Sequence, residues 1–397
     1  MRTSFSLLIL LFGLQNFAQD CDCLSDLEYV AEQLKSTPSF KSQMQNMLIY
    51  NGAKAALSQE IEKDSNIAQN CLFYLQRMLK VVKDEHIYIV DRREGIDYSE
   101  FAVSYDGSPE ALTSNAVTTE DDPITGIYDL LSSYKVAVVK TEGKDYDYAG
   151  FILESGNENW KPGQLKFTLK KSGDTYIGNF YNRFHVSNFK NVQLKNGRLY
   201  PERWVKEEFA AQHAANNYYI EGEIFQYKDY GLGVHYVRLG DFDGSNSNYK
   251  AAMDLLKIIE EKVTSGKVII DLRNNGGGGQ RTSNPFLKLF KKRKKDLEFH
   301  LLQNMYVGSN SEHFLLKMKK QLDAKTYGEN TRGALAYGFG NYSKPSLKTP
   351  CNGFSLGLTT SKYERFLEYE AVGIPPDEYL DHQTDWIGQI LGKIESK

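Results

Sequence analysis

The chain lacks a strong excess of charge of either sign. Lysine and arginine number 48 against 51 aspartates and glutamates, a formal net charge of −3 over 397 residues. Proteins that bind nucleic acids or membrane surfaces usually carry a marked basic patch, so we expect no nucleic-acid partner. One basic run extends from Lys288 to Asp296. We interpret it as the solvated end of a helix, where positive charge is favourable.

The chain also lacks, at its N-terminus, an apolar stretch long enough to span a membrane. Phe5 to Leu14 form an apolar run of ten residues, whereas a spanning helix needs about 20. Arg2 precedes this run and a small residue, Ala18, follows it after a short polar stretch. This order is typical of a secretory signal peptide. We therefore predict a signal peptide over residues 1–18, cleaved near Ala18, and an exported protein, periplasmic or secreted, with no membrane span.

Cysteine is scarce, with four residues at positions 21, 23, 71 and 351. Export permits disulfides, and four cysteines allow three full pairings. Cys21 and Cys23 are too close to pair comfortably, so we predict a disulfide from Cys71 to one of them. A zinc site is the alternative, although no Cys-x-x-Cys pair or nearby histidine accompanies these cysteines.

The pattern of apolar residues divides the rest of the chain into three parts. Residues 19–95 show helical spacing and end in a strand that starts at His86. Residues 96–230 contain short strands separated by turns such as Ser-Gly-Asp and Lys-Asn-Gly, which predict a β-rich inserted domain. Residues 231–397 alternate strands with amphipathic helices, as expected for an α/β domain. Its apolar run KVIIDL indicates a strand buried on both faces of a mainly parallel sheet.

Four consecutive glycines, Gly276 to Gly279, follow this strand. A phosphate-binding loop would continue with Gly-Lys-Ser/Thr, but Gln280 and Arg281 stand there. A dinucleotide-binding turn would need a third glycine further on, and none is present. Two interpretations of the four glycines remain. They form either a tightly packed turn or a turn whose backbone N–H groups hold an oxyanion.

Ser309 marks a second unusual position, where a strand gives way to a helix. A hydroxyl there faces outward, and the next N–H group, that of Asn310, is free at the positive end of the helix. This suits a nucleophilic serine whose oxyanion is held by the Asn310 N–H. The alternative is a plain helix cap, with Glu312 completing a capping box.

Taken together, four segments resemble the serine peptidase family of tail-specific (C-terminal processing) proteases and the tricorn core protease. That family has a strand ending in D-L-R-x-N-x-G-G, a T-x-S-x-S-E nucleophile segment, a G-E-x-T-x-G turn and a closing G-x-x-P-D. The matching segments occur here in the same order: KVIIDLRNNGGGG, VGSNSEHF, YGENTRG and EAVGIPPD. The resemblance implies a crotonase-like or ClpP-like α/β core, hydrolysis of peptides, and neither cofactor nor metal.

By the same resemblance, Ser309 is the nucleophile. The oxyanion hole would be formed by the Asn310 N–H and by a glycine N–H from Gly276 or Gly277.

The residue that one branch of this family uses as general base is missing from this sequence. Tail-specific proteases use a lysine in T-x-G-K, and Ala334 occupies that position here. The tricorn-like branch uses a histidine near the start of the domain, which matches His86 in KDEHIYI, and a glutamate that matches Glu370. Glu85 stands where that branch has a serine. His313, four residues after Ser309, is the alternative base.

These expectations describe an exported serine endopeptidase that acts on peptides or proteins through an acyl-enzyme. The alternative is a catalytically silent relative that binds peptides, which the missing lysine and Glu85 suggest. Nucleotide binding is a third, remote class. If His86 is the base, kcat/KM should fall on the acid side with an apparent pKa of about 6 to 7, and a neighbouring Glu370 or Glu85 carboxylate would push that pKa upward.

Overall fold

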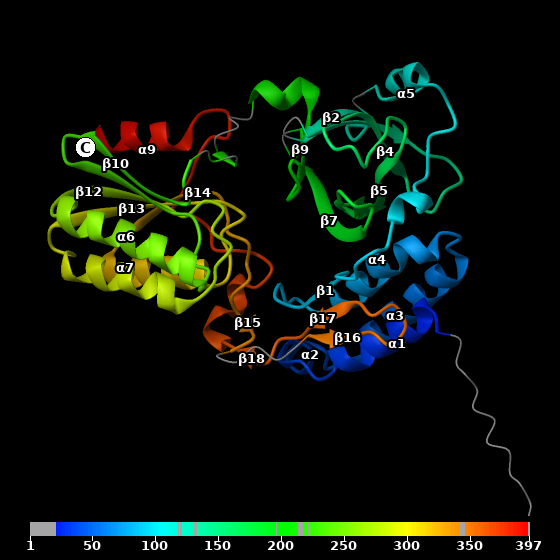
Figure 1. Ribbon diagram of the computed structural model, residues 1–397, viewed down its shortest axis with the longest axis horizontal. Helices are drawn as coiled ribbons and strands as arrows, with labels where there is room; N and C mark the ends of the chain where they lie inside the picture. Colours follow the sequence, from blue (N-terminus) through cyan, green and yellow to red (C-terminus); the bar gives the residue numbers. More distant parts are fainter. Residues whose placement is uncertain are drawn as a thin grey trace, which may run out of the picture.

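The computed structural model describes residues 21–117, 119, 121–130, 133–195, 197–212, 217–218, 220, 222–340 and 346–395. The predicted signal peptide, residues 1–18, lies outside the described residues. Figure 1 shows three parts: an α/β sheet on the left, a β-barrel at the upper right and a group of N-terminal helices at the lower right.

The N-terminal helices are α1 (Cys23–Leu34), α2 (Pro38–Gln43), α3 (Met47–Lys63) and α4 (Ile67–Leu79). The first three begin after residues whose side chains accept a backbone N–H: Asp22, Thr37 and Asn46. These caps satisfy donors that the start of a helix leaves free. The apolar positions that recur at helical spacing in α1 are buried, and they form its packed face: Leu27, Val30, Ala31 and Leu34.

A small sheet joins these helices to a distant part of the chain. β1 (Tyr88–Val90) pairs antiparallel with β17 (Ser355–Gly357), which in turn pairs with β16 (Leu347–Lys348). Phe354 and Leu356 belong to the same buried cluster as α1 and α4. In Figure 1 the orange β16 and β17 lie among the blue helices. The strand that follows His86 is therefore completed by residues from the C-terminal part of the chain.

Two disulfides fasten this region. Cys23 is bonded to Cys71 and Cys21 to Cys351, so the predicted bridge from Cys71 to one N-terminal cysteine is confirmed. No thiolate remains for the zinc alternative, because all four cysteines are bonded. The Cys23–Cys71 bridge links α1 to α4 across a sequence separation of 48, and closing such a loop is worth about 4 kcal/mol in the chain-entropy model. Disulfides persist in oxidising compartments, which suggests an exported environment.

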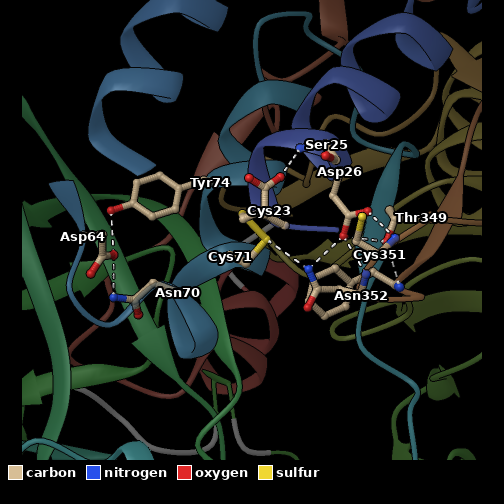
Figure 2. The surroundings of a disulfide bond; sticks show 12 residues. Cys23, Ser25, Asp26, Asp64, Asn70, Cys71, Tyr74, Thr349, Cys351 and Asn352 are labelled. Carbon is tan, nitrogen blue, oxygen red and sulfur yellow. Dashed lines mark hydrogen bonds between the residues drawn. A yellow bond between two sulfur atoms is a disulfide. The ribbon is translucent and has the colours of Figure 1, made fainter. Parts of the chain in front are cut away.

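A buried carboxylate strengthens the link between α1 and the turn before β17. Asp26 accepts hydrogen bonds from Thr349 Oγ1 at 3.0 Å and from the backbone N–H groups of Cys351 and Asn352 at 2.8 and 2.9 Å. Figure 2 shows these donors around Asp26, beside the Cys23–Cys71 disulfide. Because bonds to a charged acceptor are the stronger ones, Asp26 of α1 helps to hold this turn, which the Cys21–Cys351 bridge also ties to the residues just before α1.

The middle of the chain forms a closed β-barrel of eight strands in sequence order. Its strands are β2 (Gly126–Leu130), β3 (Tyr134–Lys140), β4 (Tyr148–Ser155), β5 (Leu165–Ser172), β6 (Thr175–Tyr181), β7 (Ser187–Lys195), β8 (Arg198–Tyr200) and β9 (Trp204–Lys206). Closure leaves no unpaired edge strand, and aromatic rings such as Phe167 and Trp204 fill the interior. A short helix, α5 (Pro109–Asn115), and two 3-10 turns, η1 (Tyr98–Phe101) and η2 (Glu207–Gln212), flank the barrel.

A six-stranded sheet carries the remaining part, in the order β10-β11-β12-β13-β14-β19. The strands are β10 (Phe225–Gly231), β11 (Val234–Leu239), β12 (Gly266–Asp271), β13 (Leu297–Gln303), β14 (Lys325–Gly328) and β19 (Glu378–Tyr379). Only the β10–β11 pair is antiparallel among them. The helices are α6 (Asn246–Lys262), α7 (Gln280–Lys292), α8 (Asn310–Leu322) and α9 (Trp386–Glu395). The α/β class is confirmed.

Both faces of the sheet are covered. Val268 and Ile270 of β12 join the cluster with α6, α7 and α8, whereas Ile269 joins the cluster with Trp386 of α9. The apolar run KVIIDL is therefore buried on both sides, as predicted. A short ladder of β15 (Tyr337–Gly338) with β18 (Ser361–Lys362), followed by the 3-10 turn η4 (Glu364–Tyr369), lies between the sheet and the N-terminal helices. No helix among the described residues has the length and apolar character needed to cross a membrane.

Candidate functional site

The glycine turn lies directly against Ser309. Gly277 has a φ of 107°, a conformation that favours glycine. A Cβ atom added there would lie 2.6 Å from Ser309 Cβ and 3.0 Å from the Asn310 nitrogen. No other residue type can occupy this position without moving the start of α8. The bare backbone therefore serves a close approach between the end of β12 and Ser309.

Ser309 itself has an unusual backbone conformation. Its φ is 55° and its ψ is −124°, which for a residue other than glycine costs of order 1–3 kcal/mol. Its backbone N–H donates to Glu312 Oε2 at 2.8 Å, but its side chain makes no capping hydrogen bond. This bond to Glu312 is the glutamate half of the capping box expected for Ser309 and Glu312. The hydroxyl is free to face another partner.

That partner is His86, at the end of the segment that leads into β1. His86 Nε2 lies 2.9 Å from Ser309 Oγ. The backbone N–H of His86 donates to Asp84 Oδ1 at 3.1 Å, and Thr359 Oγ1 donates to Asp84 Oδ2 at 2.6 Å. His86 Nδ1 is buried and has no hydrogen-bond partner among the described residues. The ring is thus directed at the serine, and the segment that carries it is tied to Thr359, which follows β17.

Glu312 holds the start of α8 to the segment after β14. Besides the Ser309 N–H, its carboxylate accepts Thr331 Oγ1 at 2.6 Å and the N–H groups of Gly333 and Ala334 at 2.8 and 2.9 Å. Burial raises the pKa of Glu312, while these four donors act in the opposite direction. The sequence indicated Glu312 only as a cap. Its wider role could be anticipated only from its place in the nucleophile segment, three residues after the serine.

Glu370 lies near the base segment but does not contact the imidazole. Its carboxylate accepts the backbone N–H groups of Glu85 at 2.8 Å, Leu335 at 3.0 Å and Ala336 at 2.7 Å. None of the hydrogen bonds among the described residues joins it to His86. Burial raises the pKa of Glu370 to about 7, although the three donors favour its ionised form. Glu370 therefore ties the residue before His86 to the segment that follows Gly333.

The alternative base, His313, faces away from this arrangement. Its Nε2 lies 3.1 Å from the carbonyl oxygen of Leu335, and its ring stacks on Phe366 at a centroid distance of 4.7 Å. Ser309 Oγ meets the Nε2 of His86 and not that of His313.

Two backbone N–H groups near Ser309 are available to hold an oxyanion. The N–H groups of Asn310 and Gly276 have no acceptor within the described parts of the chain. The Gly277 N–H, in contrast, donates to Asn275 Oδ1 at 3.0 Å. Of the two glycines predicted, Gly276 is the one whose N–H is free. Within the described ranges no group of three His, Cys, Asp or Glu side chains could hold a metal ion.

The environment of His86 lowers its pKa, in contrast to the expectation from sequence. Burial is the largest cause, because it disfavours the charged imidazolium. Asp84 and Glu85 act to raise the pKa, while Arg332 and His313 act to lower it further. The expectation that a neighbouring carboxylate raises the pKa of His86 is wrong in its net direction. Glu370 bonds to backbone N–H groups, and the effect of burial is larger than the opposing effects of Asp84 and Glu85. His86 is therefore neutral over a wider range of pH.

This balance gives a testable prediction for Arg332, an exposed residue. Replacing Arg332 with glutamine removes a positive charge that disfavours the imidazolium, so the pKa of His86 should rise. If His86 acts as a base, kcat/KM should fall more at about pH 6 than at about pH 8, because more of the variant is protonated at the lower pH. A pH–rate profile measures this change. Lys170→Gln, the same loss of charge on an exposed barrel residue, should leave the profile in place; a profile unchanged in both variants would contradict the prediction.

No family model matches the chain, and no curated protein matches it. Solved structures do. The chain is similar to mature CPAF at 12% identity and a TM-score of 0.47, covering 94% of this chain and 96% of that one. It is similar to the photosystem II D1 C-terminal processing protease at 12% identity and a TM-score of 0.37, covering 92% and 95%. Its similarity to the tricorn protease, at 11% identity and a TM-score of 0.39, covers 94% of this chain and 37% of that chain.

Proposed function

We propose that this protein is a serine endopeptidase in which Ser309 is the nucleophile and His86 the general base. The observation that carries this proposal is the 2.9 Å contact between Ser309 Oγ and His86 Nε2. It joins a hydroxyl at the start of α8 to a half-buried imidazole whose pKa is lowered, and so to a base that is neutral near pH 7. Peptides or proteins are the proposed substrates, and a crotonase-like or ClpP-like core is the proposed scaffold.

The proposed reaction has two steps. Ser309 Oγ attacks the carbonyl carbon of the peptide bond while His86 Nε2 accepts the hydroxyl proton, and the N–H groups of Asn310 and Gly276 hold the oxyanion. The carbon–nitrogen bond breaks as His86 returns that proton to the leaving nitrogen, which leaves an ester on Ser309. Water then attacks this ester, again giving a proton to His86, which passes it to Ser309 Oγ as the acid product leaves.

Three carboxylates are proposed to position these groups without touching the substrate. Glu312 fixes the strained backbone of Ser309, Asp84 fixes the backbone N–H of His86, and Glu370 fixes that of Glu85. Glu370 therefore enters the proposal as a positioning residue rather than as a direct partner of the imidazole. Export, suggested by the two disulfides, would place this activity outside the cytoplasm.

The alternative is a catalytically silent protein of the same fold that binds peptides. One observation favours it. His86 Nδ1 has no acceptor among the described residues, whereas a catalytic histidine usually has its ring oriented and its charged form stabilised by a third group.

Reaction with a fluorophosphonate probe separates the two proposals. An activated serine is phosphonylated by such a probe, whereas an unactivated hydroxyl is not. We expect one label per chain, located on Ser309 by peptide mass spectrometry, and none in Ser309→Ala. His86→Ala should slow labelling strongly. A folded protein that takes up no label at a large excess of probe would support the silent peptide binder instead.

A further inference from the structure

A cavity beside His86 has no part in the reaction proposed above. Its volume is about 480 Å³, within the range of about 300–1,000 Å³ typical of ligand pockets. Its walls come from the end of α1, from α2 and from the β1–β17–β16 sheet, and half-exposed apolar side chains form much of their surface. These are Pro38, Tyr88, Phe339, Leu347 and Leu358. Pockets that bind ligands are lined mostly by apolar and aromatic side chains of this kind.

The cavity shares its walls with the segment that carries the base. The ring of Phe339 stands edge-on to the rings of both His86 and Tyr88, each at a centroid distance of 6.1 Å. Thr359, another wall residue, is the donor to Asp84, which in turn accepts the His86 N–H. The cavity therefore shares two wall residues, Phe339 and Thr359, with the surroundings of the imidazole.

The walls also show on which side of Ser309 the cavity lies. None of its lining residues belongs to the glycine turn or to α8, which supply the oxyanion donors and the nucleophile. It is linked to the base instead, through Phe339 and Thr359. In acyl transfer the base must return its proton to the leaving nitrogen, so the leaving part of the substrate lies on the base's side. A cavity on that side faces residues C-terminal to the bond that is cut.

The length of an extended peptide shows which substrate residue can reach the cavity. Ser309 Oγ is 2.9 Å from His86 Nε2. The centroid of the His86 ring is 6.1 Å from the centroid of the Phe339 ring. Since an extended chain advances about 3.3 Å per residue, the second or third residue after the cleaved bond is within reach of the cavity.

We infer that this cavity binds a bulky apolar side chain, such as leucine or phenylalanine, at the second or third position C-terminal to the cleaved bond. This inference rests on the proposed function and assigns a substrate class to it. The bare backbone of Gly357 supports the shape of the cavity, because a Cβ there would lie 2.3 Å from the Tyr88 ring. Any larger residue at 357 would displace that ring from its present position in the wall.

Leu347 offers the test. It lines the cavity from the outer strand β16 and is 37% exposed, so a charge there should leave the fold intact. In the wild type, peptides with leucine or phenylalanine at the second or third position should be cleaved about tenfold faster, in kcat/KM, than those with aspartate or lysine. Leu347→Glu should remove this preference and favour lysine. Leu232→Glu, at a turn residue that is 96% exposed, should keep the wild-type preference.

The same peptides are also tested for binding, so that the cavity can be judged without turnover. Ser309→Ala, and the double variant that adds Leu347→Glu, are titrated with labelled peptides of each kind. If cleavage occurs with no preference at these positions, the cavity inference is overturned and the proposed function stands. If no peptide is cleaved but apolar peptides still bind Ser309→Ala better than the double variant, the cavity is a site for apolar side chains, and the peptidase proposal fails together with the position counted from a cleaved bond. Equal binding of all peptides to both proteins would overturn the cavity inference.

Discussion

Replacing Ser309 with alanine should abolish peptide hydrolysis while the protein remains folded. The hydroxyl bonds to His86 and stands at the start of a helix, so its loss should cost about 0.5–2 kcal/mol of stability at most. Removing the nucleophile of a serine peptidase lowers kcat by up to about 10⁶-fold, and we expect at least about a 10³-fold loss here. Hydrolysis of a peptide mixture, followed by mass spectrometry, measures the rate, and a thermal melt measures the stability.

A second serine at the start of a helix serves as a matched control. Ser245 precedes α6 in the way that Ser309 precedes α8, and its side chain also makes no capping bond. Ser245→Ala should keep nearly the full rate of hydrolysis. If Ser309→Ala also cleaved peptides at a comparable rate, Ser309 could not be the nucleophile.

Replacing His86 with alanine should have an effect of similar size. No other described imidazole meets Ser309 Oγ, so the serine would lose its proton acceptor and kcat/KM should fall by several orders of magnitude, about 10³-fold or more. The pH profile should change as well. Because burial lowers the pKa of His86 from its usual 6.5, wild-type kcat/KM should fall only as pH drops through a value below 6.5. In the variant, this acid limb should be absent.

Two further variants identify the base. Ala334→Lys, added to His86→Ala, restores the lysine of the tail-specific branch but should not restore activity. The Ala334 N–H is bonded to the Glu312 carboxylate, and a carboxylate beside the new ammonium would keep it charged and unable to act as a base. His313→Ala should keep most of the activity, since its Nε2 contacts the Leu335 carbonyl. If His86→Ala turned over normally and His313→Ala did not, the assignment of the base would be reversed.

Local patterns in the sequence predicted the parts of the fold that depend on local burial. The run KVIIDL predicted a strand covered on both faces, and β12 is such a strand. Hairpin turns predicted many short strands in the middle of the chain, but not that they close into a barrel. The pairing of β1 with β17 was not predicted at all. β1 has three residues, and which distant strand completes such an element depends on tertiary packing that no local periodicity records.

The candidate site was also predicted only in part from the sequence. Motifs in order along the chain predicted that Ser309 and His86 belong to one site, and their side chains meet at 2.9 Å. Motifs did not predict that Glu370 would bond to backbone N–H groups, nor that Glu312 would accept four donors. The direction of the His86 pKa was also mistaken. A pKa depends on how far the imidazole is removed from water, and burial at the junction of two distant segments cannot be read from either segment alone.

The pairing of β1 with β17 also affects when the site can form as the chain is synthesised. Ribosomes make the His86 segment well before its sheet partner, residues 355–357, and before Cys351 of the Cys21 bridge. Until then β1 has an unpaired edge on that side, and the buried cluster of the N-terminal helices lacks Phe354 and Leu356. An incomplete chain that already contains Ser309 therefore lacks the strand and the apolar residues that complete the surroundings of the His86 segment. The fold itself delays assembly of the Ser309–His86 pair until residues 351–357 have been made.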